Sequence, residues 1–411
     1  MNDINKTYHL EVECVTPLHI GAGSEADWVL GIHFLHYDSQ LYKINIRNLL
    51  KLHGGDQQFL NLLSSRDNRN ESMIACIGKG NLELLSDFTK ELPKGWGTDY
   101  FRNPIKSFLR NSLSSNPLFA GSSLKGAIRS ILLSHLRTNE SNIKEINSLF
   151  GKAEYGTDFL RFIKITDGEF GRTTFVNTKI FNLRTLSKSG WKHSGNNTTG
   201  DFNNTGFNTV YETLVPGDKS VVRISYLSAD ILDKLSDEKL FRESFKSLDK
   251  KRSVLKSDIT YLFKIINDHT RKYLNKQLLF FLKYDQAEHS DEIIASIRRL
   301  FAIIPDDNEG CLLDMSAGSG FHSITGDWMF DDFSIKKIES NGKKSKAIGS
   351  DIMGKFKESA KSRKIAIYED TFNLMGFVIL RKISEEKYNG YLADRVELDR
   401  ENKKKRKEKK Y

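Results

Sequence analysis

The chain has 411 residues, of which 28% are charged and 38% hydrophobic, a composition typical of soluble globular proteins. The 63 Lys and Arg residues outnumber the 53 Asp and Glu residues and give a net charge of +10. Residues 400–411 carry eight basic and two acidic side chains and so supply six of these ten charges. The composition therefore excludes a strongly basic folded body, and a site for an acidic partner such as nucleic acid requires local clustering of cations.

The cysteines and the N-terminus limit the compartment and the kinds of site. Cys14, Cys76 and Cys311 are far apart and form no CxxC pair, which argues against a disulfide framework and against a zinc site. The N-terminal residues lack the apolar core of a signal peptide, and no apolar run is long enough to span a membrane. We therefore expect a cytoplasmic protein in a reducing compartment, without a membrane partner.

The first predicted elements are a β-strand over residues 7–16 and, after Pro17, a glycine-rich loop over residues 18–24. The strand is predicted because its apolar and polar residues alternate. The loop contains Gly21 and Gly23, but it lacks the third Gly of a dinucleotide-binding fingerprint and the Lys-Ser/Thr pair of a P-loop. A lone Gly-x-Gly is compatible with a tight turn and with an anion site, and both interpretations stay open.

Six further elements are predicted before residue 117. Alternation of apolar and polar residues indicates the strands, and apolar residues at helical spacing indicate the helices. In chain order they are a strand pair over 29–36 and 40–46 around Asp38-Ser39, a helix over 46–53, a helical patch near 59–63, a strand near 73–77 and a short helix within 100–113.

A Gly-Ser turn leads directly into a helix predicted over residues 122–137. Apolar residues recur in it at helical spacing, so one face is buried, whereas Lys125 and Arg129 lie four residues apart on another face. A helix N-terminus, a glycine that lets a ligand approach the backbone and two cations form a candidate phosphate site. The alternative is an ordinary helix, capped by Ser122 or Ser123, with solvated basic residues. The candidate residues are Gly121, Ser122, Ser123, Lys125 and Arg129.

Residues 187–209 are dominated by Ser, Gly, Asn and Thr and are predicted to form a loop. The stretch also carries Lys188, Trp191 and Lys192. Bases stack on aromatic rings while cations follow the nucleic-acid backbone, so this mixture suits single-stranded RNA. A variable surface insertion is the alternative.

The remaining elements alternate between strands and helices, and one of them ends in a third glycine-rich turn. Gly318, Ser319 and Gly320 follow a predicted strand and precede Phe321 and His322. The other predicted elements are strands over 159–167 and 172–183 that form a hairpin, a strand over 219–228, a helical region over 229–281, a helix over 291–303, strands over 364–368 and 378–383, and a basic helix or tail after residue 391.

The sequence contains three glycine-rich turns but no recognisable catalytic set. The HExxH, GxSxG and Cys-His signatures are missing, and no spacing ties His19, His135 or His322 to a carboxylate. His135 lies close to the apolar stripe of its helix, which favours a structural role. Three backbone-lined anion sites favour binding of an extended polyanion over chemistry on a small molecule. We therefore expect no catalytic residue and no cofactor. We also expect no metal site, because exposed loop carboxylates such as Glu25, Asp27 and Asp38 are common.

Four segments together resemble one protein family. Residues 16–24, TPLHIGAGS, resemble the first motif of the RAMP (repeat-associated mysterious protein) superfamily of CRISPR effector subunits. Residues 121–129, GSSLKGAIR, are very similar to the central motif of that superfamily. Residues 318–323 resemble its C-terminal glycine-rich motif, and residues 374–377 resemble its short Leu-Gly-Trp element, with Phe in place of Trp. The four segments occur in the family's order and span most of the chain.

Length and layout are most similar to the terminal RAMP subunit of the type III-A (Csm) complex, which caps the filament at the 3′ end of the CRISPR RNA (crRNA). The resemblance implies an α+β, ferredoxin-like (RRM-like) fold with helical insertions and two modified ferredoxin-like halves. The expected divisions are an N-terminal domain over 1–209, a C-terminal α+β domain over 210–390 and a basic tail over 391–411.

The resemblance also implies partners and a role. The expected partners are crRNA, target RNA, the adjacent RAMP backbone subunit and other Csm-type subunits, with a role in crRNA maturation or complex assembly for antiviral defence. The expected RNA-binding residues are His19, Gly21, Gly23, Ser24, Gly121, Ser122, Ser123, Lys125, Arg129, Lys188, Trp191, Lys192, Gly318, Ser319, Gly320, Phe321 and His322.

One departure from the family bears on activity. Backbone subunits that cut target RNA carry an Asp after the first motif in a Gly-x-x-Asp setting, whereas the comparable stretch here reads Gly31-Ile32-His33-Phe34. This favours a subunit that does not cleave RNA. An RNA-cleaving RAMP protein is the alternative, either an Mg²⁺-dependent target nuclease or a metal-independent RNase that uses His19 or His322. A nucleotide-binding enzyme is disfavoured by the missing P-loop and Rossmann residues.

Overall fold

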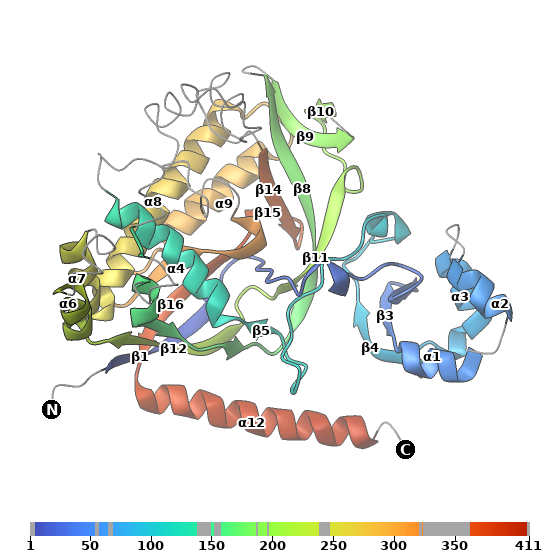
Figure 1. Cartoon of the computed structure of the whole chain (residues 1–411). Helices are drawn as coiled ribbons and strands as arrows, with labels where there is room; N and C mark the ends of the chain where they lie inside the picture. Colours follow the sequence, from blue (N-terminus) through green and yellow to red (C-terminus); the bar gives the residue numbers. More distant parts are fainter. Residues whose placement is uncertain are drawn as a thin grey trace.

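The computed structural model describes residues 5–53, 57–64, 69–137, 149–151, 158–185, 188–194, 197–237, 247–319, 323 and 362–408. In these residues, helices combine with four sheets whose named strands all pair in antiparallel fashion, which confirms the predicted α+β class (Figure 1). Two larger sheets form the body of the molecule. A smaller unit, with three helices and a three-stranded sheet, lies to one side of it (Figure 1).

The first sheet contains a ferredoxin-like arrangement. Strand β12 lies between β1 and β6 and is antiparallel to both, so β1 and β6 run parallel without touching. Helix α4 (Gly121–Leu136) lies between β1 and β6 in the chain, which makes a split βαβ unit, and β16 pairs with the other edge of β1. The strand order is β13-β16-β1-β12-β6, with bounds Gly310–Asp314, Phe377–Ile383, Asn5–Cys14, Lys219–Leu227 and Ile163–Ile165.

Strand alternation explains how both faces of β1 are covered. Leu10 and Val12 belong to the main hydrophobic core, together with residues of α4 and of α8 (Ile259–Lys283). The intervening residues face the C-terminal helix α12 (Glu385–Glu408), which runs along the opposite face of the sheet (Figure 1). There the ring of His9 lies 4.5 Å from that of Tyr388, and Lys387 pairs with Glu11 at 2.9 Å. The basic segment predicted after residue 391 is thus part of a helix.

The second sheet is organised around the long strand β8 (Thr173–Thr185). Strand β14 pairs with one edge of β8, and β11 and β9 pair in succession with the other edge. One face packs on α8 and on α9 (Ser290–Ala302), where Phe181, Phe281 and Phe372 form a second core. The other strands have bounds Lys188–Ser194 for β9, Asn197–Thr199 for β10, Asn208–Leu214 for β11, Ser362–Tyr368 for β14 and Thr371–Leu374 for β15.

The smaller unit has a core of its own and is joined to the second sheet. Leu35, Phe59 and Met73 are among the residues that form its core. A further cluster, which includes Phe34 of this unit and Phe175 of β8, connects the unit to the second sheet. Its elements are β2 (Phe34–Tyr37), β3 (Gln40–Ile44), α1 (Ile46–His53), α2 (Gln57–Ser64), α3 (Arg69–Ile77) and β4 (Ser86–Glu91).

Most predicted elements are present, including the strands at 7–16 and 219–228 and the helices at 46–53, 122–137 and 291–303. Asp38 and Ser39 form the turn between β2 and β3, with φ of 49° and 58°. The predicted helical region 229–281 divides into α6 (Ala229–Asp237), α7 (Leu248–Lys256) and α8.

Other predictions were wrong. Residues 73–77 end α3 instead of forming a strand, because Met73, Ile74 and Ile77 bury one helical face. Residues 100–113 contain only the end of a short 3₁₀ helix, Thr98–Phe101, and are otherwise mostly extended, since Ile105 and Phe108 form bridges with Trp28 and Gly21.

The predicted hairpin over 159–183 does not form, because β6 joins the first sheet and β8 the second. The predicted loop at 187–209 contains β9, β10 and the start of β11. The division of the chain at residue 209 stays a prediction, and both larger sheets combine strands from either side of that residue.

Candidate nucleic-acid interface

The first glycine-rich loop is anchored on both sides and exposed at its tip. The carbonyl of Leu18 accepts a hydrogen bond from the amide of Leu214, and that of Ile20 accepts one from Leu109, both at 2.8 Å. Gly21, Gly23 and Ser24 lie on the surface. Gly23 has φ of 101°, and a Cβ there would have open space around it, so backbone conformation and not crowding requires the glycine.

His19 is buried beneath this loop and has a structural environment. Its Nδ1 donates to the carbonyl of Glu212 at 2.7 Å, and its ring packs edge-on against Tyr211 at 4.8 Å. Burial lowers the pKa of His19, so the imidazole is neutral at physiological pH. His19 therefore positions the loop and adds no positive charge to it.

The structure brings three of the four motif segments together. The amide of Gly376 donates to the carbonyl of Pro17 at 3.0 Å, and the amide of Met315 donates to the carbonyl of Gly376 at 2.9 Å. Gly376 has φ of 104°, and a Cβ there would lie 2.3 Å from the Met315 carbonyl oxygen. The amide of Ala317 also approaches the carbonyl of His19, at 3.4 Å. We call residues 17–24, 315–319 and 374–377 the glycine cluster.

A lysine that the sequence did not single out lies at this cluster. The Nζ of Lys364, on β14, donates to the hydroxyl of Tyr211 at 2.7 Å and to the carbonyl of Ala317 at 3.0 Å. It also lies 4.6 Å from the centre of the Tyr211 ring. The only local signal was the predicted strand over 364–368, because Lys364 and Tyr211 are 153 residues apart.

The buried carboxylate of Glu212 fixes residues 105–110, the segment that pairs with the first loop. Glu212 is fully buried, and its Oε2 accepts the amide of Phe108 at 3.0 Å. Its Oε1 accepts the hydroxyl of Thr173 at 2.6 Å and forms an ion pair with Arg110. Because each bond fixes a different strand or segment, Glu212 determines where residues 105–110 lie under the loop.

The carboxylates after the first loop do not gather around a common point. Asp27 pairs with the Nζ of Lys106 at 2.5 Å, Asp38 lies in the turn between β2 and β3, and Glu25 is exposed. Within the part of the chain that the structure describes, no group of three His, Cys, Asp or Glu side chains is placed to hold a metal ion.

The start of α4 differs from the interpretation of an open phosphate site. Gly121 is buried, and its amide donates to Oδ1 of Asp167 at 2.7 Å. A Cβ at Gly121 would lie 2.7 Å from the carbonyl oxygens of Ile165 and Thr166. Gly121 therefore allows close packing of helix on strand, and Asp167 takes the capping role that was predicted for Ser122 or Ser123.

Side chains further along α4 remain available for an anion. Ser122 is exposed, and Ser123, Lys125 and Arg129 are half-buried. The guanidinium of Arg129 lies 4.9 Å from the centre of the Phe150 ring.

The α4 start and the first loop lie close together. Leu109 donates its amide to Ile20 and accepts the amide of Leu118, which precedes α4 by three residues.

Comparison with known families is decisive for the class of protein. The family model of the RAMP superfamily matches residues 11–321. The chain belongs to the RAMP superfamily. No curated protein sequence matches it.

Two solved structures resemble this RAMP protein over nearly its whole length. One is a chain of a "Csm-crRNA-target RNA ternary complex in type III-A CRISPR-Cas system", with a TM-score of 0.61 and 16% identity, covering 91% of this chain and 100% of that chain. The other is T. onnurineus Csm5, with a TM-score of 0.56 and 15% identity, covering 90% and 99%. At this identity the likeness concerns the fold.

Of the C-terminal glycine-rich motif, residues 318–323, the structure describes Gly318, Ser319 and Ser323. Ser319 is buried and donates its hydroxyl to the carbonyl of Ser316 at 2.6 Å, while Gly318 ends a short 3₁₀ turn, Ser316–Gly318. Gly320, Phe321 and His322 lie outside the described residues. Beside this turn, burial raises the pKa of Asp314 well above its usual range, and Ser319 and Ser323 only partly offset the effect.

Trp191 is placed where an RNA base does not reach it. It is 1% exposed, packs in the second core against Phe181 and Phe372, and donates its indole N–H to the carbonyl of Glu288 at 2.9 Å. A large apolar side chain gains more by filling a core than by remaining on a loop, which explains the error. Lys192 is half-buried, and Lys188 lies at the start of β9.

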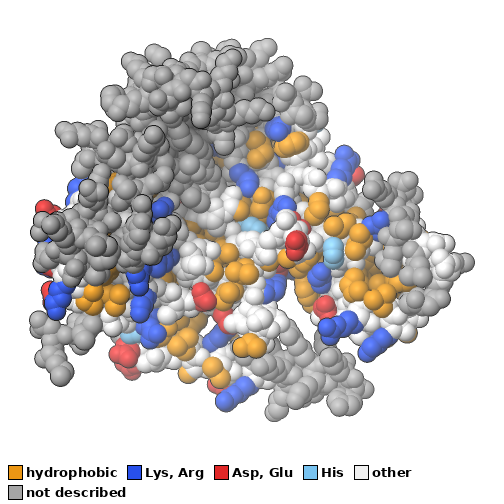
Figure 2. All heavy atoms as spheres, in the orientation of Figure 1, with side chains coloured by type: hydrophobic (Ala, Val, Ile, Leu, Met, Phe, Trp, Pro, Cys, Tyr) orange, Lys and Arg blue, Asp and Glu red, His pale blue; other side chains and the backbone are white. Residues whose placement is uncertain are grey.

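Among the described residues on the face drawn in Figure 2, the Lys and Arg side chains form no single basic field. Figure 2 shows Lys and Arg side chains in separate groups on this face, with acidic and apolar side chains between them. This distribution agrees with the modest net charge of the chain without its tail. None of the described helices is long and apolar enough to cross a membrane.

Proposed function

We propose that this RAMP protein is a crRNA-binding structural subunit of a type III-A CRISPR effector complex, where it caps the filament at the crRNA 3′ end. The observation that supports this most is the full-length likeness to two proteins of that system, 100% and 99% of whose chains are covered. Contacts with a neighbouring backbone subunit, support of crRNA maturation and a cytoplasmic location belong to the same proposal.

The chemistry of the glycine cluster suits a guide RNA. The backbone is exposed at Gly21, Gly23 and Ser24, and the cluster also contains the 3₁₀ turn Ser316–Gly318, whose Ala317 carbonyl accepts a hydrogen bond from Lys364. Backbone amides and lysine side chains are typical partners of phosphate. Contacts of this kind fix the position of an RNA strand without reading its bases. A guide must vary in sequence, so recognition of its backbone is the mode that the function requires.

A binding role also agrees with the surroundings of His19 and Asp27, two groups that a nuclease could use. His19 donates to a backbone carbonyl in a buried place, and Asp27 is engaged by Lys106. Neither group is placed to exchange protons or to hold a metal at the exposed tip of the loop. RNA cleavage that is lost in His19→Ala or in His322→Ala would favour the nuclease alternative, and dependence on Mg²⁺ would separate its two forms.

The central test is RNA binding by the double variant Lys125→Ala, Arg129→Ala. We expect an affinity at least about tenfold lower, and a slope of log affinity against log salt that is smaller by about 1.4, because two phosphate contacts to a single strand are lost. The measurement is fluorescence anisotropy with a labelled crRNA between 50 and about 300 mM salt.

The matched control removes the same charge at the same spacing from another helix. Lys272 and Lys276 lie four residues apart on the exposed side of α8. The variant Lys272→Ala, Lys276→Ala is expected to bind almost like the wild type. Equal losses in the two variants would mean that only net charge matters and would contradict a phosphate contact at α4. Co-purification of the chain with a short crRNA and Csm-type subunits tests the assignment to the complex.

A further inference from the structure

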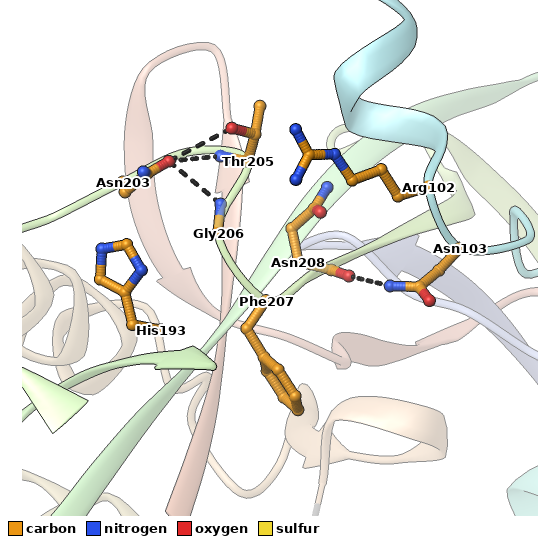
Figure 3. Close-up of a pocket in the computed structure, with 8 residues that line it drawn as sticks. All are labelled: Arg102, Asn103, His193, Asn203, Thr205, Gly206, Phe207 and Asn208. Atoms are coloured by element: carbon orange, nitrogen blue, oxygen red, sulfur yellow. Dashed lines mark hydrogen bonds between the residues drawn. The ribbon is translucent and has the colours of Figure 1, made fainter. Parts of the chain in front are cut away.

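A cavity lies between the second sheet and the segment that follows η3 (Thr98–Phe101). Its volume is about 340 Å³, at the small end of the range of about 300–1,000 Å³ for ligand sites. It therefore has room for one small planar group and not for a large ligand. The cavity is lined by Arg102, Asn103, His193, Asn203, Thr205, Gly206, Phe207 and Asn208 (Figure 3).

Hydrogen bonds within the walls hold the cavity in shape. The Oδ1 of Asn203 accepts the amides of Thr205 and Gly206 at 2.9 and 3.0 Å, which fixes the turn before β11. Asn103 donates to the carbonyl of Asn208 at 3.0 Å, and the Asn208 amide group donates to Asn177 and to the carbonyl of Tyr100. The cavity is thus formed before any ligand arrives.

Two planar cationic or aromatic groups flank this turn. Figure 3 shows the imidazole of His193 on one side of Thr205 and Gly206 and the guanidinium of Arg102 on the other. One nitrogen of Arg102 pairs with Asp99 at 2.9 Å, and with 68% of its side chain exposed the guanidinium still presents a face to a ligand. Imidazole rings and guanidinium planes are the surfaces on which unpaired RNA bases stack.

Amide groups at the cavity supply the polar edge that a base requires. Among the described residues, no hydrogen bond uses Nδ2 of Asn203 or Oδ1 of Asn103. One is a donor and the other an acceptor, so each can form a hydrogen bond with a polar group of a base. No carboxylate is among the lining residues.

The rim of the cavity carries a strained aromatic residue. Phe207 has φ of 49°, which is unusual for a bulky side chain, and it is 43% exposed. Its ring points away from the cavity in Figure 3, and the Nζ of Lys192 lies 3.8 Å from its centre. The cation of Lys192 therefore lies at the ring of this rim residue, outside the cavity.

The cavity is connected to the glycine cluster by one extended segment. Residues 102 and 103 line the cavity, Lys106 forms a bridge with Tyr211, and Phe108 forms one with Gly21. Five extended residues span on the order of 15 Å. An RNA strand bound at the glycine cluster would reach the cavity within a few nucleotides.

We infer that this cavity receives one unpaired base of the bound RNA, stacked on the imidazole of His193. The inference rests on the proposed RNA-binding function and adds a site to it. The base enters the cavity while its flanking phosphates stay outside, near Lys192. The site therefore adds one stacked base to the contacts that the subunit makes with the phosphate backbone.

The test is an abasic scan of a labelled RNA that the wild-type full-length chain binds. Removing the base at one position is expected to weaken binding about tenfold, the effect of losing one stacked base, and other positions should matter less. In His193→Ala the same abasic RNA and the intact RNA are expected to bind equally. His193→Phe keeps a planar surface and should restore the difference.

The outcomes separate this inference from the proposed function. If the wild type binds RNA but no abasic position matters, or if His193→Ala leaves the difference unchanged, the cavity does not take a base although the chain still binds RNA. If Arg102→Ala lowers affinity and salt dependence equally for intact and abasic RNA, the site contacts phosphate only and the inference is overturned. If the wild type does not bind RNA at all, the proposed function itself fails.

Discussion

Two segments that both contain glycine and serine, residues 18–24 and 121–126, have opposite physical surroundings. At Gly23 the backbone has a positive φ, a Cβ would meet open space, and the residue is exposed. At Gly121 the residue is buried, its amide is occupied by Asp167, and a Cβ would collide with two backbone carbonyls. The first glycine serves an exposed backbone, and the second serves close packing.

This difference changes which atoms can contact RNA in each segment. At the glycine cluster, backbone groups themselves are on the surface and can meet a phosphate. At the start of α4 the most N-terminal amide already has an anionic partner, so contact with RNA must come from the side chains of Ser122, Lys125 and Arg129. A shared Gly-Ser pattern therefore does not imply a shared mode of binding.

The largest expected effect is on stability and distinguishes two glycines of the same helix. Gly121→Ala is expected to lower the free energy of unfolding by about 3 kcal/mol, because its Cβ meets backbone oxygens at 2.7 Å that have little room to move. Gly126→Ala is the matched control. It is exposed in the same helix with open space around it, and it is expected to raise stability by about 1 kcal/mol. Urea unfolding of both variants measures the two changes, and changes of the same sign would break the comparison.

A smaller effect is expected for the anion that already occupies the start of α4. Asp167→Asn keeps a hydrogen-bond acceptor for Gly121 but removes the negative charge, which should cost about 0.5–1 kcal/mol of stability. With that charge gone, affinity for RNA should rise about twofold at low salt, and the gain should vanish at high salt.

The control for this change is a carboxylate in the first turn of a different helix. Asp291→Asn makes the same change in the first turn of α9, at an exposed position in the second half of the molecule. RNA affinity is expected to remain unchanged in that variant. A similar gain from both variants would show that the start of α4 has no special place in RNA binding.

The smallest expected effect is the pH dependence contributed by His19. Burial lowers its pKa in the folded state, so the unfolded chain binds more protons as the pH falls through the ordinary histidine range. The contribution of His19 to the free energy of unfolding is therefore fully present above that range, and it is lost as the pH falls toward the lowered pKa of the folded state. His19→Gln should lose less stability than the wild type between pH 7.5 and about 5, measured by thermal unfolding.

Three half-buried histidines contribute to the acid response that remains in this variant. Burial also lowers the pKa of His33, His36 and His135, so His19→Gln should reduce the effect of acid without abolishing it. An identical acid response in the variant and the wild type would contradict the buried, neutral state assigned to His19.

The sequence by itself determined the elements whose signal lies within a few residues. Alternation located β1 and β12, the apolar stripe located α4, and four short motifs identified the family and the candidate binding segments. These signals are local, because the side chains that share a face lie two, three or four residues apart. The same logic failed for Trp191, whose polar neighbours in sequence conceal a place in the second core.

Only the tertiary structure decided which of these segments meet and what each glycine does. Asp167 reaches Gly121 from 46 residues away, Glu212 fixes Phe108 from 104 residues away, and Lys364 reaches Tyr211 across 153 residues. The pairing of β6 with β12 likewise places β6 in a different sheet from the strand that follows it in sequence. Such contacts depend on how both sheets and their helices pack together, and no periodicity within one segment encodes that arrangement.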